Sequence, residues 1–122
     1  EPWARLPAMM ARCLGPDRYF TMIDLMFKDQ EKWTKAETGQ QLLDNIAAYG
    51  RLAGMTKEQF DDCMKNEKML RAMADRWREG VEKHGVEGTP HFVIGDARIS
   101  GNRPIEEFEK VLKPLVEKLP KK

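Results

Sequence analysis

The chain has 122 residues, the length of one ordinary domain, and hydrophobic side chains make up 41% of it. Its 21 basic and 20 acidic residues leave a net charge of +1. This balance lacks the excess of positive charge that nucleic-acid binding requires. No apolar run approaches the ~20 residues of a membrane span, and the first residues lack the basic and apolar stretches of a signal peptide. We therefore expect a globular protein without a membrane span. If it is secreted, its signal peptide is not present in this chain.

The first two thirds of the chain are predicted to be helical, because apolar residues recur there every three or four positions. A first helix is expected from near Arg5 to the stop at Gly15. A second is expected over 16–33 and a third over about 38–53. The inward face of the second helix is expected to hold Tyr19, Met22, Ile23, Met26 and Phe27.

Two further helices are predicted downstream. Thr56 and Gln59 have the spacing of a capping box, in which each side chain bonds a free backbone N–H of the other residue, so a short helix should begin there. A longer helix is expected from about Glu67 to His84, ended by Gly85. Apolar residues recur every four positions along it, at Met69, Met73, Trp77 and Val81.

The period then changes to two, which predicts a hairpin of strands 91–94 and 97–100 around a Gly95-Asp96 turn. After Pro104 a last helix is expected, bent by Pro114. Its apolar face should lie on a flat surface and holds Ile105, Phe108, Leu112, Leu115 and Leu119. A hairpin with one helix is marginal in water, so we expect part of its sheet to come from elsewhere.

Two cysteines, Cys13 and Cys63, allow one disulfide or two buried free thiols. A bridge would close a loop of about 50 residues, for which the chain-entropy model gives roughly 4 kcal/mol. Neither the cysteines nor His84 and His91 have zinc-ligand spacing, so no metal site is expected.

The most specific motif is the segment 85–94, Gly-Val-Glu-Gly-Thr-Pro-His-Phe-Val-Ile, followed by Gly101 and by Pro-Ile-Glu-Glu-Phe at 104–108. Together they closely resemble the C-terminal end of DsbA-type thiol-disulfide oxidoreductases. Segments 15–20, 25–33 and 60–64 resemble the inserted helical domain of that family. The resemblance implies an α/β class, a partial thioredoxin-like fold with a helical insertion domain over 1–84 and a C-terminal thioredoxin-fold segment over 85–122.

The family's chemistry needs a thiolate and a resolving thiol in a Cys-x-x-Cys at a helix N-terminus. These 122 residues contain no such pair. The resemblance therefore implies a fragment or truncated form whose catalytic cysteine precedes residue 1, with no catalytic residue in this chain. The parent is expected to be an enzyme, and these residues alone are expected to be inactive. Cys13 and Cys63 match the second, structural disulfide found in some members of the family.

Thr89-Pro90 resembles the cis-proline loop of thioredoxin folds, which binds an extended substrate in the manner of an added strand. The resemblance therefore predicts substrate-binding residues Gly88, Thr89, Pro90 and His91. From the residues alone, a trans proline that begins a strand is the alternative for Pro90. For His91 the alternatives are a residue that tunes a nearby thiolate and a solvent-facing strand residue.

The resemblance also implies unfolded or extended polypeptide substrates, a periplasmic or otherwise secreted location, and no cofactor. The incomplete sheet predicts a homodimer by strand exchange. A rival hypothesis is a non-catalytic binding module of thioredoxin-like fold that holds a peptide or a subunit. The substrate, the redox partner and the reduction potential cannot be obtained from the sequence.

Overall fold

The computed structural model describes residues 3–120. Its elements are α1 (Arg5–Cys13), α2 (Pro16–Lys28), α3 (Gln30–Trp33), α4 (Gly39–Leu52), α5 (Lys57–Met64), α6 (Glu67–His84), β1 (His91–Ile94), β2 (Ala97–Ser100) and α7 (Ile105–Glu117). They form two compact units, which divide inside α6 between Arg71 and Ala72. The domain boundary that the resemblance gives, after residue 84, remains a prediction.

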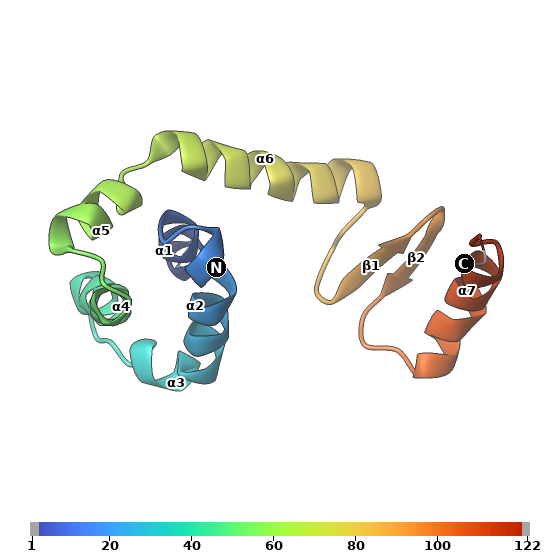
Figure 1. The fold of residues 1–122 in the computed structure, drawn as a ribbon, viewed down its shortest axis with the longest axis horizontal. Coiled ribbons are helices and arrows are strands. Elements are labelled where there is room, and N and C mark those ends of the chain that lie inside the picture. The colour runs from blue at the N-terminus through green and yellow to red at the C-terminus, as the bar shows by residue number, and fades with distance from the viewer. Residues whose placement is uncertain (1–2, 121–122) are drawn as a thin grey trace. The chain divides into compact units, whose positions relative to one another are not determined.

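The first unit is a helical bundle in which α1, α2, α4 and α5 enclose one core (Figure 1). Methionine provides much of that core, since its flexible side chain fills irregular gaps between helices. Met9, Met10 and Ile46 are the largest fully buried side chains. The predicted inward faces are confirmed at Met22 and Met26, which are 3% exposed.

Helix starts in this unit follow the local sequence closely. The hydroxyl of Thr56 accepts from the backbone N–H of Gln59 at 3.1 Å, and the Gln59 side chain accepts from the Thr56 N–H at 2.8 Å. The predicted capping box is therefore confirmed. At the start of α4 the Thr38 hydroxyl accepts from the Gln41 N–H at 3.1 Å. Each hydroxyl satisfies a backbone donor that the first turn leaves free.

The predicted single helix over 16–33 is wrong, because the structure ends α2 at Lys28 and starts α3 at Gln30. The indole N–H of Trp33 donates to the Met26 carbonyl at 2.8 Å, so the carbonyl that would accept from Gln30 in a continuous helix bonds a side chain instead. Trp33 is thereby turned into the core, where it is 7% exposed. Phe27, predicted to face inward, is 71% exposed beside this break.

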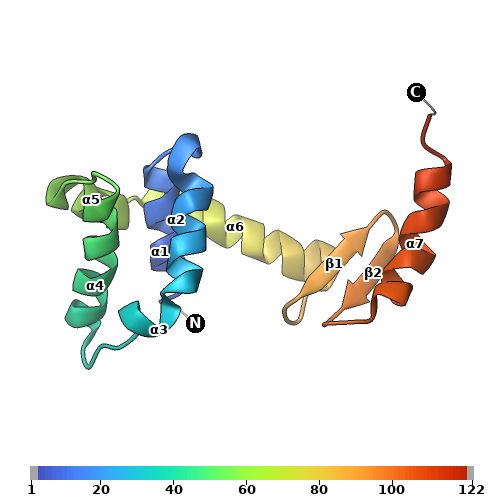
Figure 2. The same cartoon turned by 60° about the horizontal axis from the view of Figure 1, so that its bottom comes forward.

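The second unit contains the hairpin and α7. β1 and β2 pair antiparallel with Phe92 opposite Ile99, and Gly95 has a φ of 58° in the turn between them. Figure 2 shows α7 beside the hairpin, and the rings of Phe92 and Phe108 meet edge to face at 4.8 Å. The predicted hairpin is confirmed in its strands and turn.

Much apolar surface of the second unit is left uncovered within this part of the chain. No residue of α7 is buried, and Ile105 and Val116 are 64% and 60% exposed. α6 likewise buries none of its residues, and Trp77 is 71% exposed. The sheet of the described residues has two strands only. Phe108 of α7 contacts Phe92 of the hairpin, and the packing of the whole apolar face of α7 on a flat surface stays a prediction.

Candidate functional site

The predicted substrate loop lies between α6 and β1. Gly88, Thr89 and Pro90 are all exposed, and the Thr89–Pro90 peptide bond is cis. The carbonyl of Pro90 accepts from the backbone N–H of Gly101 at 2.8 Å, which joins the loop to the segment after β2. Within residues 3–120, the backbone N–H and C=O of Thr89 make no hydrogen bond. An exposed donor and acceptor on one residue at a strand entry can pair with an extended chain.

His91 opens β1 directly after this loop and is half-buried. Both of its ring nitrogens are shielded from solvent, and neither has a hydrogen-bond partner among the described residues. The alternative of a solvent-facing His91 is therefore wrong. Buried ring nitrogens normally have hydrogen-bond partners. The surroundings of His91 within residues 3–120 therefore lack a partner that such a ring normally has.

The second predicted feature, the disulfide, lies in the first unit. Cys13 at the end of α1 and Cys63 near the end of α5 are bonded to each other, with their Cα atoms 6.2 Å apart. Neither is left as a free thiol. The bond links two helices 50 residues apart in sequence, so the pairing that the resemblance implied is present.

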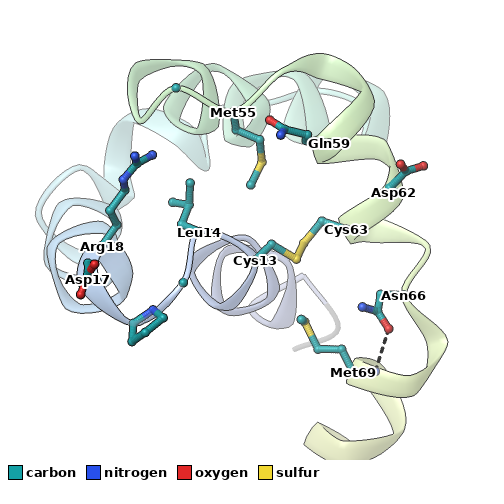
Figure 3. A pocket seen from close by; sticks show the side chains of 13 residues that line it. Cys13, Leu14, Asp17, Arg18, Met55, Gln59, Asp62, Cys63, Asn66 and Met69 are labelled. Atoms are coloured by element: carbon teal, nitrogen blue, oxygen red, sulfur yellow. Dashed lines mark hydrogen bonds between the residues drawn. A yellow bond between two sulfur atoms is a disulfide. The ribbon is translucent and has the colours of Figure 1, made fainter.

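A pocket of about 790 Å³ opens beside this disulfide (Figure 3). The turn from α1 into α2 forms one wall with Leu14 and Arg18. Met55 and Gln59 form another wall, and Asn66 and Met69 close the side nearest α6. Figure 3 draws the disulfide of Cys13 and Cys63 among the side chains that line the pocket. Arg18 is held across the pocket because its guanidinium donates to the Ala53 carbonyl at 2.6 Å.

Sequence reasoning gave the residues of the loop and of the disulfide, but it missed the pocket. The pocket is assembled from segments around residues 13–18, 54–55 and 59–69, and no local pattern reports that they meet. The sequence could have indicated that segments 13–18 and 59–69 meet only through the pairing of Cys13 with Cys63. The loop belongs to the second unit and the disulfide to the first.

Two further properties concern the described residues as a set. Within residues 3–120, no helix has both the length and the apolar content for crossing a membrane. No group of three or more His, Cys, Asp or Glu side chains among them is arranged to hold a metal ion.

Known proteins give matches to most of the chain. Residues 2–114 match the family described as Thioredoxin. A candidate protein-disulfide oxidoreductase of Rickettsia conorii is 25% identical over 111 residues, which are 90% of this chain and 39% of that protein. Another from Rickettsia bellii is 27% identical over 88 residues, which are 71% of this chain and 33% of that protein. A third, from Rickettsia felis, is 23% identical over 111 residues, 90% of this chain and 38% of that protein.

The chain spans about a third to two fifths of the length of these curated relatives. No solved structure gives a significant match. The family match covers almost the whole chain, and the hairpin, the last helix and the added helices fit the predicted partial thioredoxin-like fold. The chain belongs to the thioredoxin family.

Proposed function

We propose that these residues are the substrate-binding part of a DsbA-type thiol-disulfide oxidoreductase that acts on secreted proteins in the periplasm. Residues 1–84 would form its helical domain and 85–122 the C-terminal part of its thioredoxin fold. The observation that carries the proposal is the exposed Thr89 backbone, without a partner in residues 3–120, inside a family match over 2–114. The relatives named as candidate protein-disulfide oxidoreductases support the reaction class.

The reacting dithiol would come from a segment that precedes residue 1 in a longer protein. Disulfide transfer needs an attacking thiolate and a nearby resolving thiol. Cys13 and Cys63, the cysteines of these 122 residues, are bonded to each other and belong to two helices of the first unit. We therefore assign them a stapling role and assign the transfer to cysteines outside this chain.

The loop would bind substrate through its main chain. The N–H and C=O of Thr89 would pair with one residue of an extended polypeptide, as in the addition of a strand to a sheet edge. Pro90 and Gly88 would hold this residue exposed, and His91 would lie beside it. Because main-chain pairing reads no side chain, it suits an enzyme with many unfolded substrates.

Peptide binding to two Thr89 variants tests this assignment. The probe is an extended peptide with serine in place of cysteine, so that no disulfide exchange occurs, and the measurement is its Kd. Thr89→Pro removes the N–H and should raise Kd about fivefold, the effect of roughly 1 kcal/mol for one hydrogen bond. Thr89→Ala keeps the main chain and should leave Kd within about twofold. Equal losses in both variants would contradict main-chain recognition.

The two-stranded sheet would be completed by strands from the same preceding segment. This would cover the exposed apolar residues of α7, such as Ile105 and Val116. Exchange of strands between two copies is the alternative, and it predicts a dimer for this chain. Light scattering across a concentration series distinguishes them, because a monomer at all concentrations would contradict strand exchange.

A second candidate function, a peptide- or subunit-binding module without redox chemistry, is favoured by the same Thr89 groups, since they need no cysteine. The coding sequence upstream of Glu1 separates the two. We expect a Cys-x-x-Cys about 25–60 residues before Glu1, because the missing strand and helix of the fold need that length. A start codon adjacent to Glu1 would overturn the oxidoreductase proposal and support the binding module.

A further inference from the structure

The two cysteines of the disulfide differ in their exposure to solvent. Cys63 is buried at 4% exposure, whereas Cys13 is exposed. Both line the pocket of about 790 Å³, whose volume lies within the range of sites for small organic ligands. Figure 3 shows the disulfide among the residues that line the pocket, and Cys13 is the more exposed of its two cysteines.

Thiol-disulfide exchange depends on which sulfur an incoming thiolate can reach, because the attack occurs at one sulfur and expels the other. A disulfide enclosed in a core is protected because neither sulfur can be approached. This one stands on the wall of an open pocket with one exposed cysteine, so it lacks that protection on one side only. Because Cys13 is exposed and Cys63 is buried, we expect an incoming thiolate to attack Cys13 and to expel Cys63.

We propose that Cys13 is a thiol-exchange site for low-molecular-weight thiols. The thiolate of the incoming molecule attacks Sγ of Cys13, the Cys13–Cys63 bond breaks, and a mixed disulfide forms on Cys13. The electron pair of the broken bond leaves with Cys63 as a thiolate, which takes a proton from water. No other oxidant or reductant is consumed in this step.

The released Cys63 has a defined place in the fold. Its Sγ lies 3.3 Å from the carbonyl oxygen of Met9, to which the protonated thiol can donate a hydrogen bond. A protonated thiol must lose its proton before it can close the bond again, because the thiolate is the attacking form. The site therefore stores a small thiol on Cys13 while α1 and α5 stay packed through Met10 and Phe60, which belong to one buried core and are 0% and 5% exposed.

The polar lining of the pocket sets which thiols fit. Asp17 and Asp62 bring two carboxylates, and Arg18, whose guanidinium donates to the Ala53 carbonyl, brings one positive charge. An anionic thiol gains no net attraction from this set. We assign the site to small uncharged or cationic aliphatic thiols.

The test is the rate at which 2-mercaptoethanol opens the disulfide in the folded chain at urea concentrations below the unfolding transition. Attack through the pocket predicts a rate that urea leaves unchanged. Attack on the unfolded chain predicts a rate that rises with urea in step with the unfolding equilibrium, and this outcome would overturn the proposal.

Two surface variants of α5 provide a matched pair. Asp62→Trp places a large ring at the pocket wall and should slow the opening severalfold, whereas Glu58→Trp, on the same helix but not lining the pocket, should leave the rate unchanged. Equal rates for both variants and the parent would contradict access through the pocket. After acid quenching and alkylation in denaturant, the hydroxyethylthio group should be on Cys13 and the alkyl group on Cys63. The reverse placement would also overturn the proposal.

Discussion

Tyr49 and Asp29 join two helical segments through one hydrogen bond. The Tyr49 hydroxyl donates to a carboxylate oxygen of Asp29 at 3.0 Å. Burial, this hydrogen bond and the negative charge of Asp29 together raise the pKa of Tyr49 above its ordinary value of about 10. Because the pKa is raised in the folded state, the stabilising contribution is present below about pH 10 and is lost as the pH rises through the folded pKa.

This predicts a pH-dependent difference between the parent chain and Tyr49→Phe. The free energy of unfolding of the parent should fall more steeply above about pH 10 than that of the variant, because only the parent must ionise this hydroxyl. Urea unfolding at a series of pH values measures it. Asp29→Asn should lower the pKa of Tyr49, seen by ultraviolet titration. Parallel stability profiles for parent and Tyr49→Phe would contradict the assignment.

At the residue scale, local interactions could be predicted from the sequence and distant ones could not. The capping box of Thr56 and Gln59 depends on a spacing of three residues, which a sequence pattern contains in full. The contact between Tyr49 and Asp29 joins residues 20 apart, and no pattern specifies it. The same holds for His91, whose shielded ring nitrogens depend on surroundings beyond its own strand.

At the scale of elements, helical periodicity located the core faces but not their limits. Met26 and Phe27 were both expected inside, yet one is 3% and the other 71% exposed. The helix break at Asp29 explains the difference, because the indole bond from Trp33 to Met26 reorganises the chain there. A break caused by a side chain seven residues along cannot be seen in periodicity.

Two substitutions to alanine test this assignment of faces. Ile46→Ala removes a side chain with 0% exposure and should lower the free energy of unfolding by about 2–5 kcal/mol, because it leaves a cavity. Phe27→Ala should change it by less than about 0.5 kcal/mol, since the ring is exposed. Urea unfolding followed by circular dichroism measures both. A large loss from Phe27→Ala with a small one from Ile46→Ala would reverse the faces described.

At the scale of the whole molecule, the disulfide should be the largest single contribution to the first unit. It closes a loop between residues 50 apart, for which the chain-entropy model gives roughly 4 kcal/mol. The double variant Cys13→Ala, Cys63→Ala should therefore unfold at markedly lower urea than the oxidised parent. The reduced parent is the control and should match the variant. Equal stability of the oxidised parent and the variant would exclude a stapling role.

Apart from the break between α2 and α3, the order of elements in residues 3–120 was predictable, and the completeness of the fold was not. The hairpin strands and the long helix α6 begin and end at the residues expected, because turns, caps and periodicity are local signals. The exposed apolar residues of α7 have no local explanation, because a sheet is built from segments distant in sequence. The proposed dithiol lies outside these 122 residues, because they contain no Cys-x-x-Cys.

Insulin reduction by two forms of the protein tests the central claim most directly. One form is this 122-residue chain, and the other is the same chain extended by the residues encoded upstream. We predict multiple turnovers by the extended form, abolished when the first cysteine of its upstream Cys-x-x-Cys is changed to alanine, and no turnover by the chain alone. Multiple turnovers by the 122-residue chain, or an inactive extended form, would contradict the claim that its catalytic dithiol lies before residue 1.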